Sequence, residues 1–309
     1  MRCSYAGAVE VILPPGRARN KRELQKDRKE GKKLVIKKNK PETNTPPRAC
    51  LPRTRLYVGT ELGAQVSVAA SRDQSHYLRY VLRLDVGGEM ILFNGRDGEW
   101  LARLQPGTGD EAMIEAVEQL RPQIDPPDLW LVFAILKRSR LDFLVEKATE
   151  LGVAELWPVV TRHTVVRRIN GPYLRARCVS AAQQIDRMNV PLVHGAEKLK
   201  SVLEDWPAGR RLLFCDESGE GLPIAEALMS LRESEPGARG AGQWAVLTGP
   251  DGGFSPTELD ALHKLPFATA VGLGPRVLRA DTAAFAALAC WQAILGDWHE
   301  SCRFEPHPV

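Results

Sequence analysis

The chain has 309 residues, 44% of them hydrophobic, which is enough for two domains and a substantial core. Its apolar runs are too short to span a membrane, and its first residues lack the layout of a signal peptide. The net charge of +4 is uneven: residues 17–40 hold 12 Lys or Arg and 3 Asp or Glu, so this segment carries +9 and the remainder −5. Composition therefore gives little support for nucleic-acid binding by the body of the chain.

The cysteines and histidines favour a reduced compartment and no metal. The six cysteines are scattered without a CxxC pair, and the six histidines show no HxxxH spacing. Two of the cysteines lie in apolar runs, as small core residues do. We therefore expect a cytoplasmic protein with neither a disulfide framework nor a metal site.

Residues 1–50 are expected to be a disordered basic extension. The Lys-rich run and the proline-rich stretch after it contain too little apolar sequence to fold alone. A solvated tail, or a start assigned too early, is the simpler interpretation. An arm that attracts RNA is the alternative.

Residues 51–121 are expected to form a small β domain. Residues 90–104 contain two apolar runs around a glycine turn at 94–98, which predicts a hairpin. Residues 76–84 predict a helix with Leu78, Val81 and Leu82 on one face and with Arg79 and Arg83, four residues apart, on another. Residues 110–120 suit either a strand or a helix. A proline-containing linker, 121–128, follows.

Residues 129–300 alternate between predicted strands and helices, which indicates an α/β domain with a mostly parallel sheet. Residues 129–136 are a continuous apolar run, as in a strand buried on both faces. Ser139 or Asp142 can cap the next helix, and Ser255 and Glu258 supply a capping box for a later one. The last helix is expected over residues 282–298.

Two glycine-rich loops near the C-terminus are the best candidates for a binding site. LTGPDGGF (247–254) and VGLGPRVLRADTAAFAA (271–287) each combine an apolar run, a glycine loop and a helix start. Ligands of α/β sheets bind at the carboxyl ends of strands, and glycine allows close approach of the backbone. Tight strand-to-helix turns are the alternative interpretation. P-loop and dinucleotide patterns do not occur in these loops.

Charged residues cluster after the second loop. Arg276 and Arg279 precede a helix N-terminus, where two guanidinium groups can stabilise a phosphate or a developing oxyanion. Solvent-exposed loop charge is the alternative. Asp281 suits either a helix N-cap or a catalytic base.

These motifs resemble the RsmE family, the 16S rRNA uridine-N3 methyltransferases of the SPOUT superfamily. The pattern also includes residues 137–153 (KRSRLDFLVEKATELGV), residues 183–191 (QQIDRMNVP), and RLYV and HYLRYVLRL in the β domain, and it covers residues 52–298. Asp251 and Asp281 stand where the family has Glu and keep the charge. Gln183 also replaces a Glu, which argues against an ionised role there.

The resemblance implies an N-terminal PUA-like β-barrel that binds RNA and a C-terminal α/β domain tied in a trefoil knot. It also implies S-adenosylmethionine bound in the knot and a homodimer whose interface borders the site. The implied reaction methylates N3 of a uridine, with Arg279, Arg276 and Asp281 as catalytic candidates. The cofactor candidates are Leu247, Thr248, Gly249, Pro250, Gly253, Gly272, Leu273, Gly274, Val277, Leu278 and Arg279.

The implied substrate is 16S rRNA or the assembled small ribosomal subunit. Basic residues at the start of each domain are the RNA candidates, with a solvated charged surface as the alternative for about half of them. These residues are Arg53, Arg55, Arg72, Arg79, Arg83, Lys137, Arg138 and Arg140. Two other functions remain open: a SPOUT enzyme that methylates another RNA or another atom, and a catalytically silent RNA-binding relative.

Overall fold

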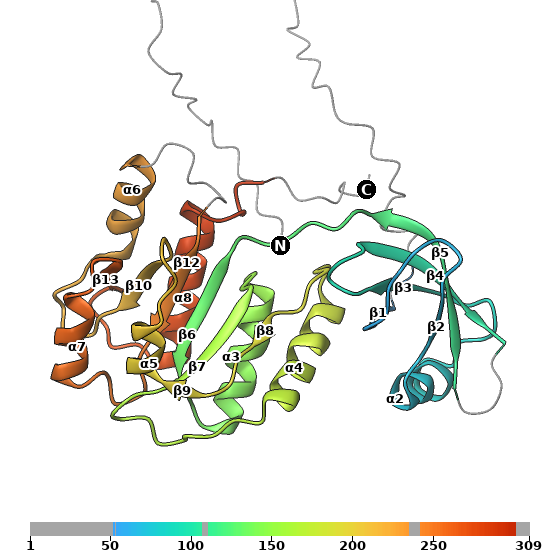
Figure 1. The fold of residues 1–309 in the computed structure, drawn as a ribbon, viewed down its shortest axis with the longest axis horizontal. Helices are drawn as coiled ribbons and strands as arrows, with labels where there is room; N and C mark the ends of the chain where they lie inside the picture. Colours follow the sequence, from blue (N-terminus) through green and yellow to red (C-terminus); the bar gives the residue numbers. More distant parts are fainter. Residues whose placement is uncertain (1–51, 53, 107–110, 235–241, 301–309) are drawn as a thin grey trace, which may run out of the picture. The chain divides into compact units, whose positions relative to one another are not determined.

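A computed structural model gives the fold of the chain (Figure 1). The structure describes residues 52, 54–106, 111–234 and 242–300, all within one compact unit, Thr45–Val309. The basic extension expected at residues 1–50 and the RNA candidate Arg53 lie outside the described residues. Among the described residues, no helix combines the length and the apolar character needed to cross a bilayer.

The N-terminal part forms a five-stranded sheet in the order β1-β3-β4-β5-β2. β1 runs parallel to β3, and the other pairs are antiparallel. The strands are β1 (Arg55–Tyr57), β2 (Ser67–Ala69), β3 (Glu89–Phe93), β4 (Glu99–Gln105) and β5 (Met113–Arg121). The predicted hairpin is confirmed as β3–β4, with Gly95 at φ 81° and Gly98 at φ 82°. Of the segment at 110–120, for which the sequence suits either a strand or a helix, residues 113–120 belong to strand β5.

The helix predicted over residues 76–84 is only partly confirmed. The chain forms α2 (Arg72–His76) and then a π-helical turn, η2 (Tyr77–Val81). Leu78 is fully buried, but Val81 is 59% exposed. Arg83 has a φ of 52°, so the helix has ended before this residue. Arg79 and Arg83 therefore do not share a regular α-helical face.

The C-terminal part is an eight-stranded parallel sheet in the order β11-β13-β10-β12-β6-β7-β8, with β9 beside β7. The strands are β6 (Leu129–Ala134), β7 (Glu155–Val160), β8 (Leu192–Val193), β9 (Glu197–Lys198), β10 (Arg211–Cys215), β11 (Leu222–Pro223), β12 (Trp244–Thr248) and β13 (Ala268–Gly272). The central strands β6 and β12 are buried at every position, as their continuous apolar sequences predict.

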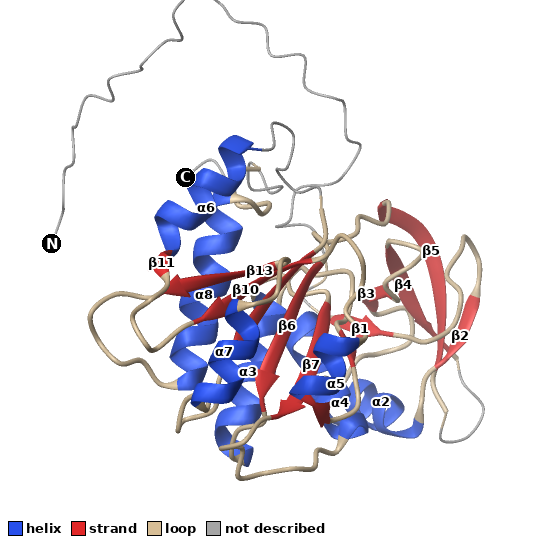
Figure 2. Cartoon of the chain, turned by 60° about the vertical axis from the view of Figure 1, so that its left-hand side comes forward, coloured by secondary structure: helices blue, strands red, loops and turns tan. Residues whose placement is uncertain are grey.

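Helices cover both faces of this sheet (Figure 2). The helices are α3 (Arg138–Glu150), α4 (Gly171–Gln184), α5 (Leu199–Glu204), α6 (Ile224–Ser234), α7 (Pro256–His263) and α8 (Ala280–Ile294). Residues of α3, α4, α6 and α8 share one apolar cluster, whereas those of α5 and α7 belong to another. The predicted α/β architecture is therefore confirmed.

Two of the predicted helix starts are wrong. α3 begins at Arg138 after Lys137, without a side-chain cap from Ser139 or Asp142. α8 has Arg279 at its N-cap, and Asp281 lies in its first turn. The carboxylate of Asp281 bonds mainly to another side chain, which takes it away from capping. The capping box of Ser255 and Glu258 is confirmed at α7.

Candidate functional site

Three loops meet at the carboxyl edge of the parallel sheet. Residues 249–255 follow β12, and residues 273–279 follow β13. β10 lies between these two strands, so its own following loop, residues 216–221, reaches the same edge. Sequence analysis identifies the first two loops but not the third.

Glu217 of this third loop holds the first glycine loop. Its Oε1 accepts a hydrogen bond of 2.6 Å from the backbone N–H of Phe254. Gly253 has a φ of 68°, and a Cβ at this position would lie 2.3 Å from Glu217 Oε1. The backbone conformation therefore favours glycine here, and a Cβ would displace the Glu217 carboxylate from its bond with Phe254. The sequence feature that could have identified Glu217 is its position just after β10, a buried strand of the same sheet.

His163, in the loop after β7, contacts the other side of the first glycine loop. Its Nδ1 lies 3.1 Å from the carbonyl oxygen of Gly252 and 3.0 Å from that of Gly253. Carbonyl oxygens only accept, so Nδ1 carries the proton. The backbone N–H of Arg162 donates to Glu258 Oε1 at 2.8 Å. The loop after β7 is thereby attached to the glycine loop.

The second glycine loop combines open backbone with exposed apolar side chains. Gly272 ends β13, and Gly274 has a φ of 94° with open space where a Cβ would be. Val277 is 98% exposed, and Leu273 and Leu278 are half-buried. An apolar surface beside accessible backbone suits a flat, uncharged ring with polar edges.

Arg140 joins the two glycine loops. Its guanidinium forms two hydrogen bonds with Asp281, Nε to Oδ2 at 3.0 Å and Nη2 to Oδ1 at 2.7 Å. Its Nη1 donates to Asp251 at 2.6 Å. Arg140 was expected to contact RNA, but its side chain is 22% exposed and its donors are largely committed to these carboxylates. Holding the loops together is the role that this geometry supports.

Asp281 is poorly suited to act as the predicted base. Hydrogen bonds from Arg140, and to a lesser degree from the backbone N–H of Thr282, hold its pKa below the usual value. A carboxylate with a lowered pKa is a weak proton acceptor. Arg276 and Arg279 are exposed, and their side chains form no hydrogen bond or ion pair with another described residue. These two cations remain available to a ligand.

Arg55 is buried rather than presented to RNA. Its side chain is 5% exposed and pairs with Glu99, Nη2 to Oε1 at 2.7 Å. It also donates to carbonyl oxygens at the end of α4, including that of Ala182 at 2.8 Å. Burial lowers the pKa of its guanidinium. The residue connects the five-stranded sheet to α4, so its contact is structural.

The other RNA candidates differ in their surroundings. Arg72, Arg83, Lys137 and Arg138 are exposed. Arg79 is half-buried, and its Nη2 donates to the carbonyl oxygen of Glu111 at 3.0 Å. The structure thus leaves four of these cations exposed, two in the N-terminal part and two in the C-terminal part.

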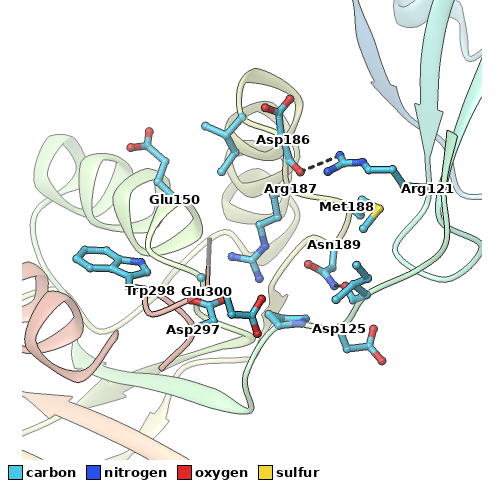
Figure 3. A pocket seen from close by; sticks show the side chains of 14 residues that line it. Arg121, Asp125, Glu150, Asp186, Arg187, Met188, Asn189, Asp297, Trp298 and Glu300 are labelled. Carbon is cyan, nitrogen blue, oxygen red and sulfur yellow. Dashed lines mark hydrogen bonds between the residues drawn. The ribbon is translucent and has the colours of Figure 1, made fainter. Parts of the chain in front are cut away.

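A cavity of about 540 Å³ lies elsewhere, beside the 121–128 linker (Figure 3). Its lining includes Gly152 and Glu150, which lie between the end of α3 and the start of β7, away from the carboxyl edge of the sheet. The side chain of Arg187 donates to the carbonyl oxygens of Thr149 and Val153 at 2.5 and 2.6 Å. The guanidinium of Arg187 therefore satisfies carbonyl oxygens at and after the end of α3. The cavity is separate from the glycine loops.

Comparison with known proteins identifies the family. A family model described as the RNA methyltransferase domain matches residues 124–292, and one for the RNA methyltransferase PUA domain matches residues 71–114. Ribosomal RNA small subunit methyltransferase E of Rickettsia conorii is 30% identical over 237 residues, which cover 76% of this chain and 93% of that protein. The chain belongs to the RsmE family.

Other RsmE proteins match over most of their length. The protein from Synechocystis is 29% identical and covers 78% of each chain. The crystal structure of the Neisseria gonorrhoeae protein bound to S-adenosylmethionine has a TM-score of 0.70 and 25% identity, covering 79% of this chain and 99% of that one. The fold predicted from the RsmE resemblance is therefore confirmed in its PUA and α/β parts.

One departure from the RsmE pattern has a structural explanation. Gln183 stands where the family motif has Glu, and its Oε1 accepts a hydrogen bond of 3.0 Å from the backbone N–H of Tyr57. An amide oxygen satisfies this donor without a charge. The neutral residue can therefore hold β1 against α4.

Proposed function

We propose that the chain transfers a methyl group from S-adenosylmethionine to N3 of a uridine in 16S rRNA. The observation that carries this proposal is the pair of glycine loops at one sheet edge, tied by Arg140 and followed by two free arginines. The RsmE relatives act on ribosomal RNA of the small subunit by name, and a structural relative binds S-adenosylmethionine. Such a substrate also favours a cytoplasmic location.

The loop residues fit the cofactor. Gly249, Gly253, 272–274, Val277 and Leu278 supply glycine backbone and apolar side chains at one edge of the sheet, whereas the candidates Leu247, Thr248 and Pro250 are buried beneath it. The exposed Val277 offers apolar contact to the adenine, and the backbone at Gly272 and Gly274 can approach its polar edge and the ribose. When bound, S-adenosylmethionine supplies an electrophilic methyl group.

Arg279 and Arg276 are assigned to charge stabilisation. Uracil N3–H is a weak acid, and loss of its proton places negative charge on O2 and O4. Two guanidinium groups beside the N-terminus of α8 favour this charge or that of a neighbouring phosphate. We assign Asp281 to positioning rather than proton transfer, because its ion pair with Arg140 keeps it a weak base.

We also propose that the C-terminal α/β domain is tied in a trefoil knot. β13 lies between β10 and β11, although β10 and β11 are consecutive in the chain and joined by residues 216–221. A Cβ at Gly221 would lie 2.8 Å from the backbone of Val271 in β13. The last strand thus packs directly against the loop that it would thread.

A homodimer through α3 and α8 is proposed from the apolar surface of these helices. Phe143 is 48% exposed and packs edge-on against Phe285 with ring centroids 5.5 Å apart. The nearly fully exposed Val277 precedes α8. Light scattering should give the mass of a dimer, and Phe143→Ser should shift it toward the monomer.

The decisive experiment identifies the methylated nucleoside. The purified protein is incubated with methyl-labelled S-adenosylmethionine and either 16S rRNA or assembled small subunits, and the digested RNA is analysed by chromatography. We expect labelled 3-methyluridine. A different methylated nucleoside would indicate another RNA-modifying activity. Absence of label together with absence of cofactor binding by calorimetry would indicate a silent relative.

A further inference from the structure

A run of arginines follows strand β7 in the sequence and has no role in the proposed methyl transfer. Between Glu155 and Asp186 the chain contains five arginines and no Lys, Asp or Glu. They are Arg162, Arg167, Arg168, Arg175 and Arg177. The rest of the chain outside residues 17–40 is acidic, so this local charge stands out against its surroundings.

The fold places this run between the glycine loops and the five-stranded sheet. It begins beside His163, which contacts the first glycine loop, and continues into α4. α4 packs between α3 and β1 (Figure 1). The inner face of α4 is apolar, with Leu174 and Cys178 buried, so Arg175 and Arg177 are exposed on the outside.

Two tyrosine rings contact arginines on opposite sides of α4, including Arg138 of α3. Arg175 donates to the hydroxyl of Tyr57 at 2.9 Å, and its guanidinium lies 5.3 Å from the centre of that ring. Arg138 and Arg177 lie 5.1 and 5.4 Å from the centre of the Tyr173 ring. Tyr57 belongs to β1, so these contacts span from the α/β domain to the five-stranded sheet.

We propose that the exposed arginines before α4 and on its β1 side, Arg167, Arg168 and Arg175, named the α4 track, bind the sugar–phosphate backbone of the RNA substrate. The proposal rests on the RNA methylation proposed above. Guanidinium groups bind phosphate oxygens in a planar geometry, and arginines stacked on aromatic rings can also accept bases. The track follows the loop that contacts the first glycine loop and ends on the helix that packs against β1, so RNA that reaches both places passes these arginines.

Arg177 is excluded from the test because it has a structural partner. Its Nη2 lies 3.5 Å from Asp142 Oδ2, and it donates to the hydroxyl of Tyr173. Arg168 and Arg175 are exposed without an acidic partner among the described residues. Arg175 has one neutral partner, the hydroxyl of Tyr57, and α4 stays attached to β1 through Gln183 and Arg55, so removing the two charges should leave the fold intact.

The test compares R168Q/R175Q with the control K200Q/K264Q. Lys200 and Lys264 are exposed and belong to α5 and the end of α7, on the other face of the sheet. The dissociation constant for transcribed 16S rRNA is measured between about 50 and 250 mM KCl. R168Q/R175Q should weaken binding about tenfold or more at 150 mM and lower the slope of log K against log salt by about 1.4–1.8. The control should change binding by less than about twofold.

Two further measurements separate the possible outcomes. Calorimetry should show unchanged affinity for S-adenosylmethionine in both variants, which shows that the fold is intact. Three results would contradict RNA binding by the α4 track. They are equal weakening of RNA binding by both variants, an unchanged salt slope, and a change in the mass of R168Q/R175Q by light scattering. A wild-type protein that binds RNA along the track without methylating it would refute the proposed function alone.

Discussion

Arg140 and Asp281 form a bidentate ion pair between residues 141 positions apart in the sequence. The two bonds measure 2.7 and 3.0 Å and connect the first turn of α3 to the first turn of α8. The same guanidinium reaches Asp251 in the other glycine loop. One side chain therefore sets the separation of the two loops that we assign to the cofactor.

This pair should be energetically coupled. The free energies of unfolding of wild type, Arg140→Gln, Asp281→Asn and the double variant, measured in urea at pH 7, should give a coupling energy of about 1–3 kcal/mol. The reason is that both side chains are largely shielded from solvent, at 22% and 14% exposed. Lys200 and Glu204 form an exposed pair on α5, at 84% and 62% exposed, and serve as the control, with an expected coupling of about 0.3–0.5 kcal/mol. Equal coupling in the two cycles would contradict the shielding argument.

The same pair predicts a pH dependence of stability. The folded-state pKa of Asp281 is lowered, so its contribution is fully present above the unfolded pKa of about 3.9 and is lost as pH falls through the folded value. The difference in stability between wild type and Asp281→Asn should be constant from pH 5 to 7 and shrink below pH 4. Urea unfolding at a series of pH values measures it. A difference that persists unchanged at pH 2.5 would contradict the assignment.

Much of the fold could be predicted from the sequence, because hydrophobic pattern and glycine position are local signals. The apolar sequences of β6 and β12 predict buried strands, and the two glycine loops predict a ligand-binding site. Long-range side-chain partners are not local signals. The partner of Arg55 is 44 residues away and that of Arg140 is 141 away, so both arginines looked like surface charges. Glu217 lacked a motif of its own, and only the sheet order brings it to Phe254.

Arg279 should affect turnover more than cofactor binding. Arg279→Ala is expected to lower kcat by about 10²–10³-fold, because a donor near the developing uracil charge is lost. Affinity for S-adenosylmethionine, measured by calorimetry, should change little if the side chain faces the RNA. Arg276→Ala under the same conditions shows which arginine has the larger effect. Methylation at a nearly normal rate by both single variants and by the double variant would reject this role.

Gly253→Ala should disturb the first glycine loop. The added methyl group would lie 2.3 Å from Glu217 Oε1 and would also require a left-handed backbone conformation for alanine. We expect at least a tenfold loss of affinity for S-adenosylmethionine by calorimetry. Gly59→Ala is the control, because a Cβ there meets no atom within 4 Å and no positive φ is involved. Unchanged cofactor affinity in Gly253→Ala would mean that this loop does not shape the cofactor site.

Replacement of Arg55 should reduce stability without directly affecting RNA binding. Arg55→Met leaves the buried Glu99 with Arg121 as its remaining ionic partner and leaves carbonyl oxygens at the end of α4 without a donor. Because Glu99 keeps this partner, the main cost is that of the carbonyl oxygens left without their donor, so we expect a decrease of about 1–3 kcal/mol in the free energy of unfolding. Arg103→Met removes an exposed pair with Glu89 in the same sheet and should cost less than about 1 kcal/mol. If Arg55→Met instead kept full stability and weakened binding of 16S rRNA, Arg55 would have to be assigned to RNA binding.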